Sequence, residues 1–195
     1  MKIHEIKQQS PEWFNVRKLK ATASHATAIG NCGKGLDTYV LEIVAEYLSS
    51  ADKEQFSNKH TDRGNELEPQ ARTIYELTTG KDVKQVGFIE HNDYVGCSPD
   101  GLIDDDGGLE IKCIDDVGYL KMLLGEEISS DYQWQIQMNL LITGRKWWDF
   151  VAYNPNFKQS IIIKRVVPDK DKQEKLSNGF ILAENKIKEI LNKLN

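Results

Sequence analysis

Two short segments joined by a turn constrain this chain more than any other feature: residues 98–101 read SPDG, and residues 109–113 read LEIKC. Residues 104–108, between them, read DDDGG and predict a hairpin turn, because Asp and Gly tolerate a positive φ. Side chains alternate along a strand, so Glu110 and Lys112 share one face while their apolar neighbours point the other way, toward a core. The sequence thus predicts a strand with one apolar and one charged face.

Pairing across this hairpin would bring Asp100, at a strand end, beside Glu110. Two carboxylates at such a distance repel each other unless a hard cation lies between them, and ligation by oxygen atoms is what Mg²⁺ prefers. Lys112, next to such a site, would hold or activate an attacking water and offset the charge that develops on a phosphate. The spacing favours a metal-dependent nuclease, although a charged strand face near an Asp-Gly turn also occurs in proteins without this function.

The length and composition are those of a globular chain. With 195 residues, a hydrophobic fraction of 39% and no internal linker, residues 1–195 are expected to form one domain. No apolar run approaches the roughly 18 to 20 residues that cross a bilayer, and the N-terminus lacks the apolar stretch of a signal peptide, so we expect no membrane contact and a cytoplasmic location. The three Cys are widely spaced and predict neither a disulfide framework nor a zinc site.

The net charge of −5 argues against indiscriminate coating of nucleic acid, which usually requires a basic excess. The charges are nevertheless unevenly distributed. Residues 1–35 hold six Lys and Arg against two Asp and Glu, whereas residues 89–116 hold one Lys against nine acidic residues. A basic entrance beside an acidic pocket suits an enzyme that holds phosphates near metal ions, although ordinary solvated surfaces show the same unevenness.

Hydrophobic periodicity and capping signals predict an alternation of helices and strands. Helices are expected over residues 10–19, 24–29, 36–48, 64–77, 116–124 and 131–142, and again after Pro168. Strands are expected over residues 83–90, 94–98, 109–113, 147–153 and 160–167. This order predicts the α/β (α+β) class, with a central mixed sheet flanked by helices.

The hairpin motif resembles a known nuclease signature. Asp100, preceded by Pro99 and followed after ten residues by Glu110-Ile111-Lys112, is similar to the PD-(D/E)xK pattern of restriction-endonuclease-like nucleases. More narrowly, SPDG followed by LEIKC resembles the lambda-exonuclease-type viral recombinase family. Residues 13–24, 63–68 and 135–137 also occur in that family's order, so the resemblance covers roughly residues 10 to 155 and implies a restriction-endonuclease-like core.

The resemblance implies a magnesium site. Its expected ligands are three carboxylates and one main-chain carbonyl, at Glu68, Asp100, Glu110 and Ile111. Lys112 matches the catalytic lysine, and Gln135 matches a helical glutamine expected near the water or the phosphate. Glu66 is a nearby alternative to Glu68 as the helical ligand. Glu68 itself could instead be an exposed acidic residue of the helix. Two Mg²⁺ ions are expected, with Mn²⁺ able to substitute.

The same resemblance implies a pocket for a terminal 5′-phosphate. Its matching positions are Arg17, Ser24 and Ser98, with Lys59 a weaker match. An arginine fork with hydroxyl groups suits a phosphate monoester, which carries more charge than an internal diester and so distinguishes chain ends. As an alternative, Arg17 could be an ordinary solvated helix residue.

The function implied is that of a magnesium-dependent 5′-to-3′ exonuclease that degrades one strand of linear double-stranded DNA and leaves 3′ single-stranded tails for recombination. Its expected partners are DNA ends, further copies of the chain in a ring-shaped homotrimer, and a single-strand-annealing recombinase, in the host cytoplasm if a phage encodes the chain. Two alternatives stay open. One is another PD-(D/E)xK nuclease, an endonuclease or a CRISPR-associated type, although an iron-sulfur cluster would need four Cys and the chain has three. The other is a non-catalytic DNA-binding module.

Overall fold

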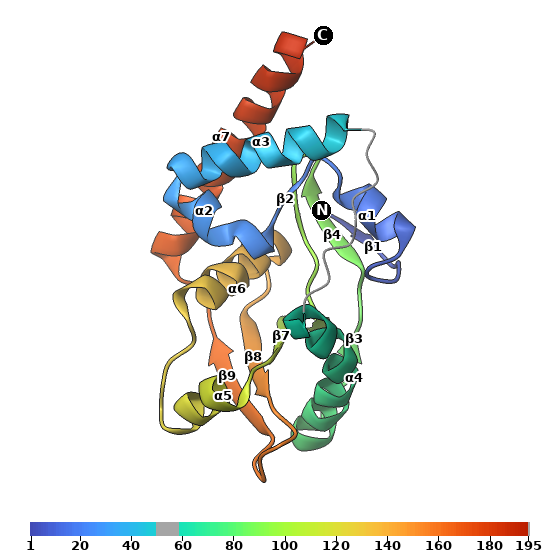
Figure 1. Cartoon of the computed structure of the whole chain (residues 1–195), viewed down its shortest axis with the longest axis vertical. Helices are drawn as coiled ribbons and strands as arrows, with labels where there is room; N and C mark the ends of the chain where they lie inside the picture. Colours follow the sequence, from blue (N-terminus) through green and yellow to red (C-terminus); the bar gives the residue numbers. More distant parts are fainter. Residues whose placement is uncertain (50–58, 195) are drawn as a thin grey trace.

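Within the part of the chain that the structure describes, the strands form two mixed sheets packed among helices (Figure 1). This computed structural model describes residues 1–49 and 59–194, apart from the side chains of residues 59–62 and 65. The first sheet has the order β1 (Lys2–His4), β4 (Phe88–Asn92), β5 (Val95–Cys97) and β2 (Ala21–Thr22). The second has the order β3 (Val83–Lys84), β6 (Gly101–Ile103), β7 (Gly107–Cys113), β8 (Trp147–Tyr153) and β9 (Ile161–Val166). The pairs β2–β5 and β7–β8 are parallel and the others antiparallel.

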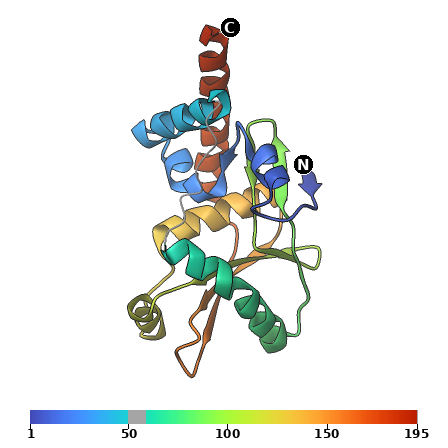
Figure 2. The ribbon, with the colours of Figure 1, turned by 45° about the vertical axis from the view of Figure 1, so that its right-hand side comes forward.

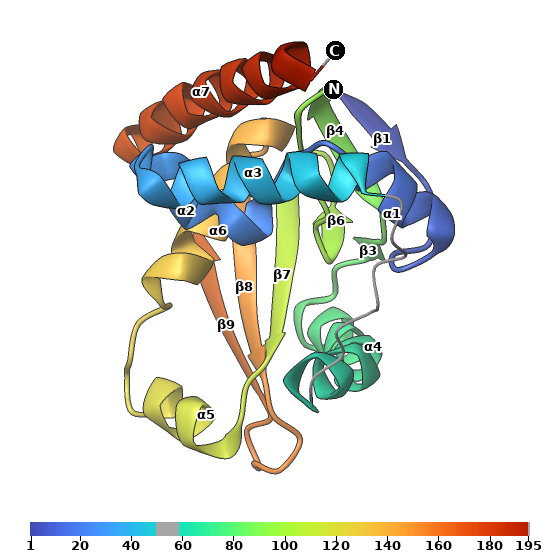
Figure 3. The same ribbon diagram turned by 45° about the horizontal axis from the view of Figure 1, so that its top comes forward.

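The helices lie on both sides of the second sheet, which confirms the predicted class. They are α1 (Pro11–Arg17), α2 (Ala26–Asn31) after a 3-10 turn (Ala23–His25), α3 (Lys34–Leu48), α4 (Lys59–Thr79), α5 (Asp116–Leu123), α6 (Ser130–Thr143) and α7 (Lys170–Leu194). Figures 2 and 3 show α2, α3 and α7 grouped at one end of the molecule, with α6 between this group and strands β7, β8 and β9. α4 contacts β7, β8 and β9. No described helix combines the length and apolar character needed to span a membrane.

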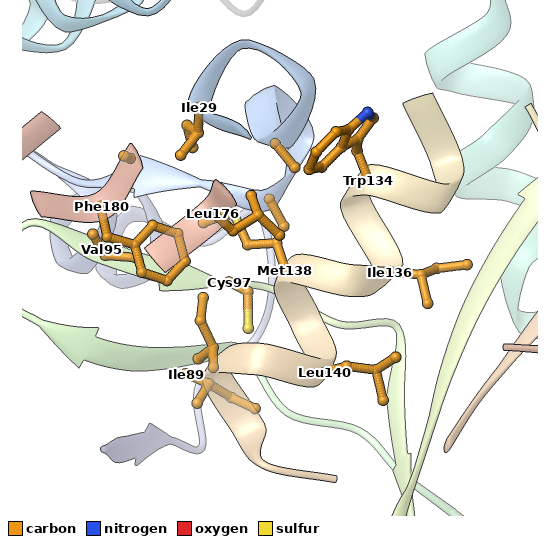
Figure 4. Packing of buried hydrophobic residues seen from close by; sticks show 14 of the residues in the cluster. Ile29, Ile89, Val95, Cys97, Trp134, Ile136, Met138, Leu140, Leu176 and Phe180 are labelled. Carbon is orange, nitrogen blue, oxygen red and sulfur yellow. The ribbon is translucent and has the colours of Figure 1, made fainter. Parts of the chain in front are cut away.

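The largest core surrounds α6, which is buried on several sides because neighbouring elements cover it. In Figure 4, Trp134 points toward α2 and Met138 lies against Leu176 of α7, while Ile136 points away from both. A Cβ at Gly30 would lie 2.4 Å from the Trp134 ring, so only glycine fits there. The helix expected over residues 24–29 therefore continues through Gly30 to Asn31.

β7 is covered on both faces, by different helices. Leu109 and Ile111 are buried in a second cluster that includes Ala71 and Tyr75 of α4. Glu110, between them, is also buried but points to the side of α6. The predicted alternation of apolar and charged faces along this strand is confirmed, and the charged face is covered by protein instead of solvent.

One strand prediction was wrong because long-range contacts decide where the strand divides. The strand expected over residues 83–90 is divided between β3 and β4, which belong to different sheets. Between them, a Cβ at Gly87 would lie 2.3 Å from the Ile6 carbonyl oxygen, so the segment before α1 crosses the chain here at close range. β1, which pairs with β4, was not predicted from its short sequence.

Candidate active site

The β6–β7 hairpin sets Asp100 beside Glu110. Gly101 pairs with Leu109 in the antiparallel ladder, so the residue before Gly101 reaches the level of Glu110. There Asp100 Oδ2 accepts a hydrogen bond from the Ile111 main-chain N–H at 2.6 Å. Two acidic residues thus meet at one strand end.

Glu110 is held from α6 and from its own strand. Its Oε1 accepts from Gln135 Nε2 at 2.5 Å and lies 2.7 Å from Lys112 Nζ. Its Oε2 accepts from Asn139 Nδ2 at 3.3 Å. The side chain of Glu110 is only 2% exposed, so these contacts replace water as its partners. The structure therefore brings Gln135 and Lys112, both expected at the site, directly to Glu110.

Lys112 is a half-buried cation among carboxylates. Burial alone lowers its pKa, but Glu110 and Asp100 more than compensate and raise the pKa above its ordinary value. The Nζ also lies 5.1 Å from the centre of the Tyr132 ring, within cation–π range. Lys112 therefore stays protonated at neutral pH.

Glu68 approaches the same charges from α4. It forms an ion pair with Arg72, one turn further along the helix. Burial raises the pKa of Glu68, and the charge of Glu110 adds to this, while Arg72 opposes it. Burial also raises the pKa of Asp100 well above its ordinary value, with further contributions from Glu110 and then Glu68. These mutual effects show that the three carboxylates lie within electrostatic range of one another.

The described residues contain no ready-made cluster of three metal-ligating side chains. The carboxylate oxygens are instead engaged by cationic and amide groups, of Lys112, Arg72 and Gln135. The donor set still fits a hard divalent cation, because it offers only oxygen atoms and its buried carboxylates repel one another. The Ile111 carbonyl, the fourth expected ligand, belongs to the residue whose N–H already holds Asp100.

A second cluster lies beside the acidic residues. Arg17 Nη1 donates to Ser98 Oγ at 3.0 Å, and the guanidinium lies 4.1 Å from the centre of the Trp13 ring. Trp13 Nε1 donates to Ser98 Oγ at 3.0 Å and to the Gly87 carbonyl at 2.9 Å. α1 therefore holds an arginine and an indole over a serine that precedes Asp100 by two residues. Two of the expected phosphate-binding residues are thus together.

Ser24, the third expected phosphate-binding residue, contacts other residues than Arg17 and Ser98. Ser24 Oγ lies 3.2 Å from Thr22 Oγ1 and 3.2 Å from His25 Nδ1, and so interacts with its sequence neighbours. Ser24 is exposed at the start of the 3-10 turn, whereas Arg17 is only partly accessible. The side chain of Lys59 lies outside the described residues.

Sequence reasoning missed two residues that contact the site, both on α6. Asn139 follows Gln135 by one helical turn, and Tyr132 precedes Gln135 by three residues. Residues at these spacings share a helix face, so the position of Gln135 could have indicated both.

The Asp100–Glu110–Lys112 hairpin within a mixed sheet defines the PD-(D/E)xK class of nucleases. Within this class, the chain belongs to the YqaJ-like viral recombinase domain family, whose sequence profile matches residues 12–146. The predicted relationship to the viral recombinase family is confirmed. No curated protein matches the chain significantly.

Solved structures agree with this assignment. The chain is similar to an alkaline exonuclease (LHK-Exo) from Laribacter hongkongensis, with 30% identity and a TM-score of 0.81 over 95% of this chain and 98% of that one. The same values hold for LHK-Exo in complex with dAMP. A phage-related exonuclease from Haemophilus somnus 129PT shares the fold, with 18% identity and a TM-score of 0.68 over 93% of this chain and 99% of that one. The family and fold together identify the chain as an exonuclease-type enzyme.

Proposed function

We propose that the chain is a magnesium-dependent 5′-to-3′ exonuclease that degrades one strand of linear double-stranded DNA and leaves 3′ single-stranded tails for recombination. One observation carries this proposal: Asp100, which meets Glu110 and Lys112 at the hairpin, follows Ser98 of the arginine–serine pair by only two residues. A group suited to a terminal phosphate and a group suited to hydrolysis of a phosphodiester would thus be joined by one short segment.

The acidic residues would hold Mg²⁺, with two ions expected and Mn²⁺ able to substitute. The residues that would hold them are Glu68, Asp100, Glu110 and the Ile111 carbonyl. When bound, Mg²⁺ supplies Lewis-acid chemistry and makes water a nucleophile near neutral pH. Supporting this is the raised pKa of Asp100, caused first by burial and then by the charges of Glu110 and Glu68, which a bound cation would oppose.

The protein's own groups have separate roles in this proposal. Lys112, kept protonated by its neighbours, offsets the negative charge that develops on the scissile phosphate and orients the attacking water. Gln135 holds Glu110 in place through one carboxylate oxygen. Attack on phosphorus breaks the bond to the 3′ oxygen, which leaves as a 3′-hydroxyl on the released mononucleotide. The shortened strand then begins with a new 5′-phosphate.

The arginine–serine pair would select the strand end. A terminal phosphate is a monoester with more charge than an internal diester, and Arg17 offers a planar fork of donors that suits it. Ser24 and Lys59 remain proposed contributors to this pocket. The complex of the related LHK-Exo with dAMP is consistent with a site that accepts a mononucleotide carrying a 5′-phosphate.

The proposed partners follow from the family resemblance. They are double-stranded DNA ends, a homotrimeric ring of the chain and a single-strand-annealing recombinase. A ring around DNA would retain its substrate by topology, which suits a chain with a net charge of −5 better than binding through a basic surface would.

A digestion assay tests the proposal. Linear duplex DNA with 5′-phosphate ends, incubated with Mg²⁺, should yield mononucleotides and 3′ single-stranded tails, and EDTA should abolish this. The 5′-hydroxyl duplex should be digested more slowly, and closed circular DNA not at all. Cleavage of closed circular DNA would indicate an endonuclease instead, and no cleavage of any substrate with Mg²⁺ or Mn²⁺ would contradict the proposal.

A further inference from the structure

Asn139 is a buried amide on the face of α6 that covers Glu110. It is 0% exposed, and its Nδ2 donates to Glu110 Oε2 at 3.3 Å. Gln135, one turn earlier, donates to the other oxygen, Oε1, at 2.5 Å. One helix face therefore holds both oxygens of the same carboxylate.

The burial of Asn139 is not explained by packing. Its neighbours Met138, Leu140 and Ile142 are buried apolar residues, as expected for a helix in a core. Its own Oδ1 has no hydrogen-bond partner in the described structure, and an unpaired buried acceptor destabilises a fold. An apolar residue of similar size would avoid this defect. The contact with Glu110 is therefore what distinguishes the amide from an apolar residue at this position.

Its partner Glu110 has a competing interaction. Oε1 accepts from Gln135 of α6 and pairs with the Lys112 ammonium of β7, so both of these contacts act on the same oxygen. A contact on that oxygen alone would leave the carboxylate free to turn about its last bond. The Asn139 contact on Oε2 removes this freedom, because two fixed donors define the plane of the group.

We propose that Asn139 is a positioning residue for the divalent-cation site: by holding Oε2, it fixes the plane of the Glu110 carboxylate for metal ligation. This inference rests on the proposed function, since it assigns Glu110 to metal binding. Partners that orient metal ligands typically change metal affinity by roughly 10–100-fold when they are replaced.

The test uses Asn139→Leu and Asn139→Ser in the full chain and measures Mn²⁺ binding directly, by titration calorimetry without DNA. We expect the dissociation constant for Mn²⁺ to rise about tenfold or more in both variants. The melting temperature of each metal-free variant is measured alongside, because losing the unpaired Oδ1 stabilises the fold whereas losing the donor to the buried Glu110 carboxylate destabilises it. The Mg²⁺ concentration for half-maximal digestion should rise in parallel, while the KM for DNA stays the same.

Gln137→Leu is the matched control. This buried amide, two residues away on α6, donates to the Val167 carbonyl at 2.8 Å and accepts from the Asp169 N–H at 2.8 Å, so it serves structure alone. It should lower the melting temperature and leave Mn²⁺ affinity unchanged. Wild-type Mn²⁺ affinity in both Asn139 variants, or an equal loss of affinity in the control, would overturn the inference. If Asn139→Leu does not fold, Asn139→Ser decides. Failure of the wild type to digest DNA would instead contradict the proposed function, and the Mn²⁺ titration would still test Asn139.

Discussion

Lys112 Nζ lies 2.7 Å from Glu110 Oε1, and the two residues occupy the same face of β7. The pair is largely withdrawn from water, with Glu110 2% and Lys112 25% exposed. Burial on its own would favour the neutral amine, but the neighbouring carboxylates raise the pKa of Lys112 above its usual value. The carboxylates therefore hold Lys112 as an ammonium beside Glu110.

The first prediction concerns this charge. Lys112→Ala should lower the rate of DNA digestion by roughly 100-fold or more, because one preorganised group that stabilises transition-state charge is lost. DNA binding should largely survive, and both are measured with the same 5′-phosphorylated duplex. Lys146→Ala is the control, since Lys146 is 78% exposed and pairs only with Asp106 in the β6–β7 turn. Equal digestion by wild type and Lys112→Ala would refute the assigned role.

The second prediction concerns the cost of ionising Asp100. Its pKa is raised in the folded chain, so ionisation opposes folding: the cost is absent below the unfolded pKa of about 3.9, grows as the pH rises through it, and is complete above the folded pKa. Asp100→Asn should therefore melt at a higher temperature than the metal-free wild type, by an amount that increases with pH. Each kcal/mol is worth roughly 2–4 °C in a domain of this size.

Two further measurements make this prediction specific to the proposed metal site. Mg²⁺ should raise the melting temperature of the wild type but not that of Asp100→Asn, and the variant should not digest DNA. Asp93→Asn, a change in the turn between β4 and β5, is the control. Its melting temperature without metal, the rise of that temperature with Mg²⁺ and its digestion of DNA should all match the wild type. If Asp100→Asn melts below the metal-free wild type at every pH, then ionisation of Asp100 does not oppose folding.

The sequence predicted the parts of the site that depend on local rules. Alternation along residues 109–113 correctly assigned Leu109 and Glu110 to opposite faces. The Asp-Gly turn correctly predicted a hairpin that places Asp100 beside Glu110. Ser10 caps α1 through the Trp13 N–H, at the residue where this helix was expected to begin. Each of these features is determined by residues within about a dozen positions of one another.

The sequence could not predict features that depend on long-range packing. The split of residues 83–90 between two sheets is determined by the crossing of the chain at Gly87. Whether α6 would direct Asn139 toward Glu110 or into the apolar core depends on how that helix lies on the strands. Nothing local distinguished Ser24, which contacts its sequence neighbours, from Ser98, which contacts Arg17.

The third prediction concerns the selection of chain ends. Arg17→Lys keeps the positive charge but loses the planar fork of donors. It should reduce kcat/KM on 5′-phosphorylated duplex by roughly 10–100-fold, the value of one or two charge-assisted hydrogen bonds, and leave the rate on 5′-hydroxyl duplex unchanged. Lys18→Ala is the control, because Lys18 directly follows Arg17, is exposed, and carries the same charge without belonging to the arginine–serine pair. Equal losses on both substrates would mean that Arg17 does not read the terminal phosphate.

The fourth prediction concerns the anchoring of α4, which carries Glu68. Tyr75, two turns after Glu68, donates to Asp149 Oδ2 at 2.8 Å. Arg165 binds the same buried carboxylate through Nε at 2.8 Å and Nη2 at 2.9 Å. Tyr75→Phe removes one donor from a buried charge and should lower the free energy of unfolding by about 1–3 kcal/mol, measured by urea denaturation.

The effect of this change on activity separates anchoring from simple stability. If the Tyr75–Asp149 contact keeps α4 in register with β8, then Tyr75→Phe should also raise the Mg²⁺ concentration needed for half-maximal digestion, because Glu68 lies on the same helix. Tyr47→Phe is the control, because Tyr47 is 48% exposed near the end of α3 and its hydroxyl is not buried. It should change neither the free energy of unfolding nor the Mg²⁺ concentration needed for half-maximal digestion. A loss of stability without a change in the Mg²⁺ requirement would mean that Glu68 is positioned by its own pair with Arg72 and not by this anchor.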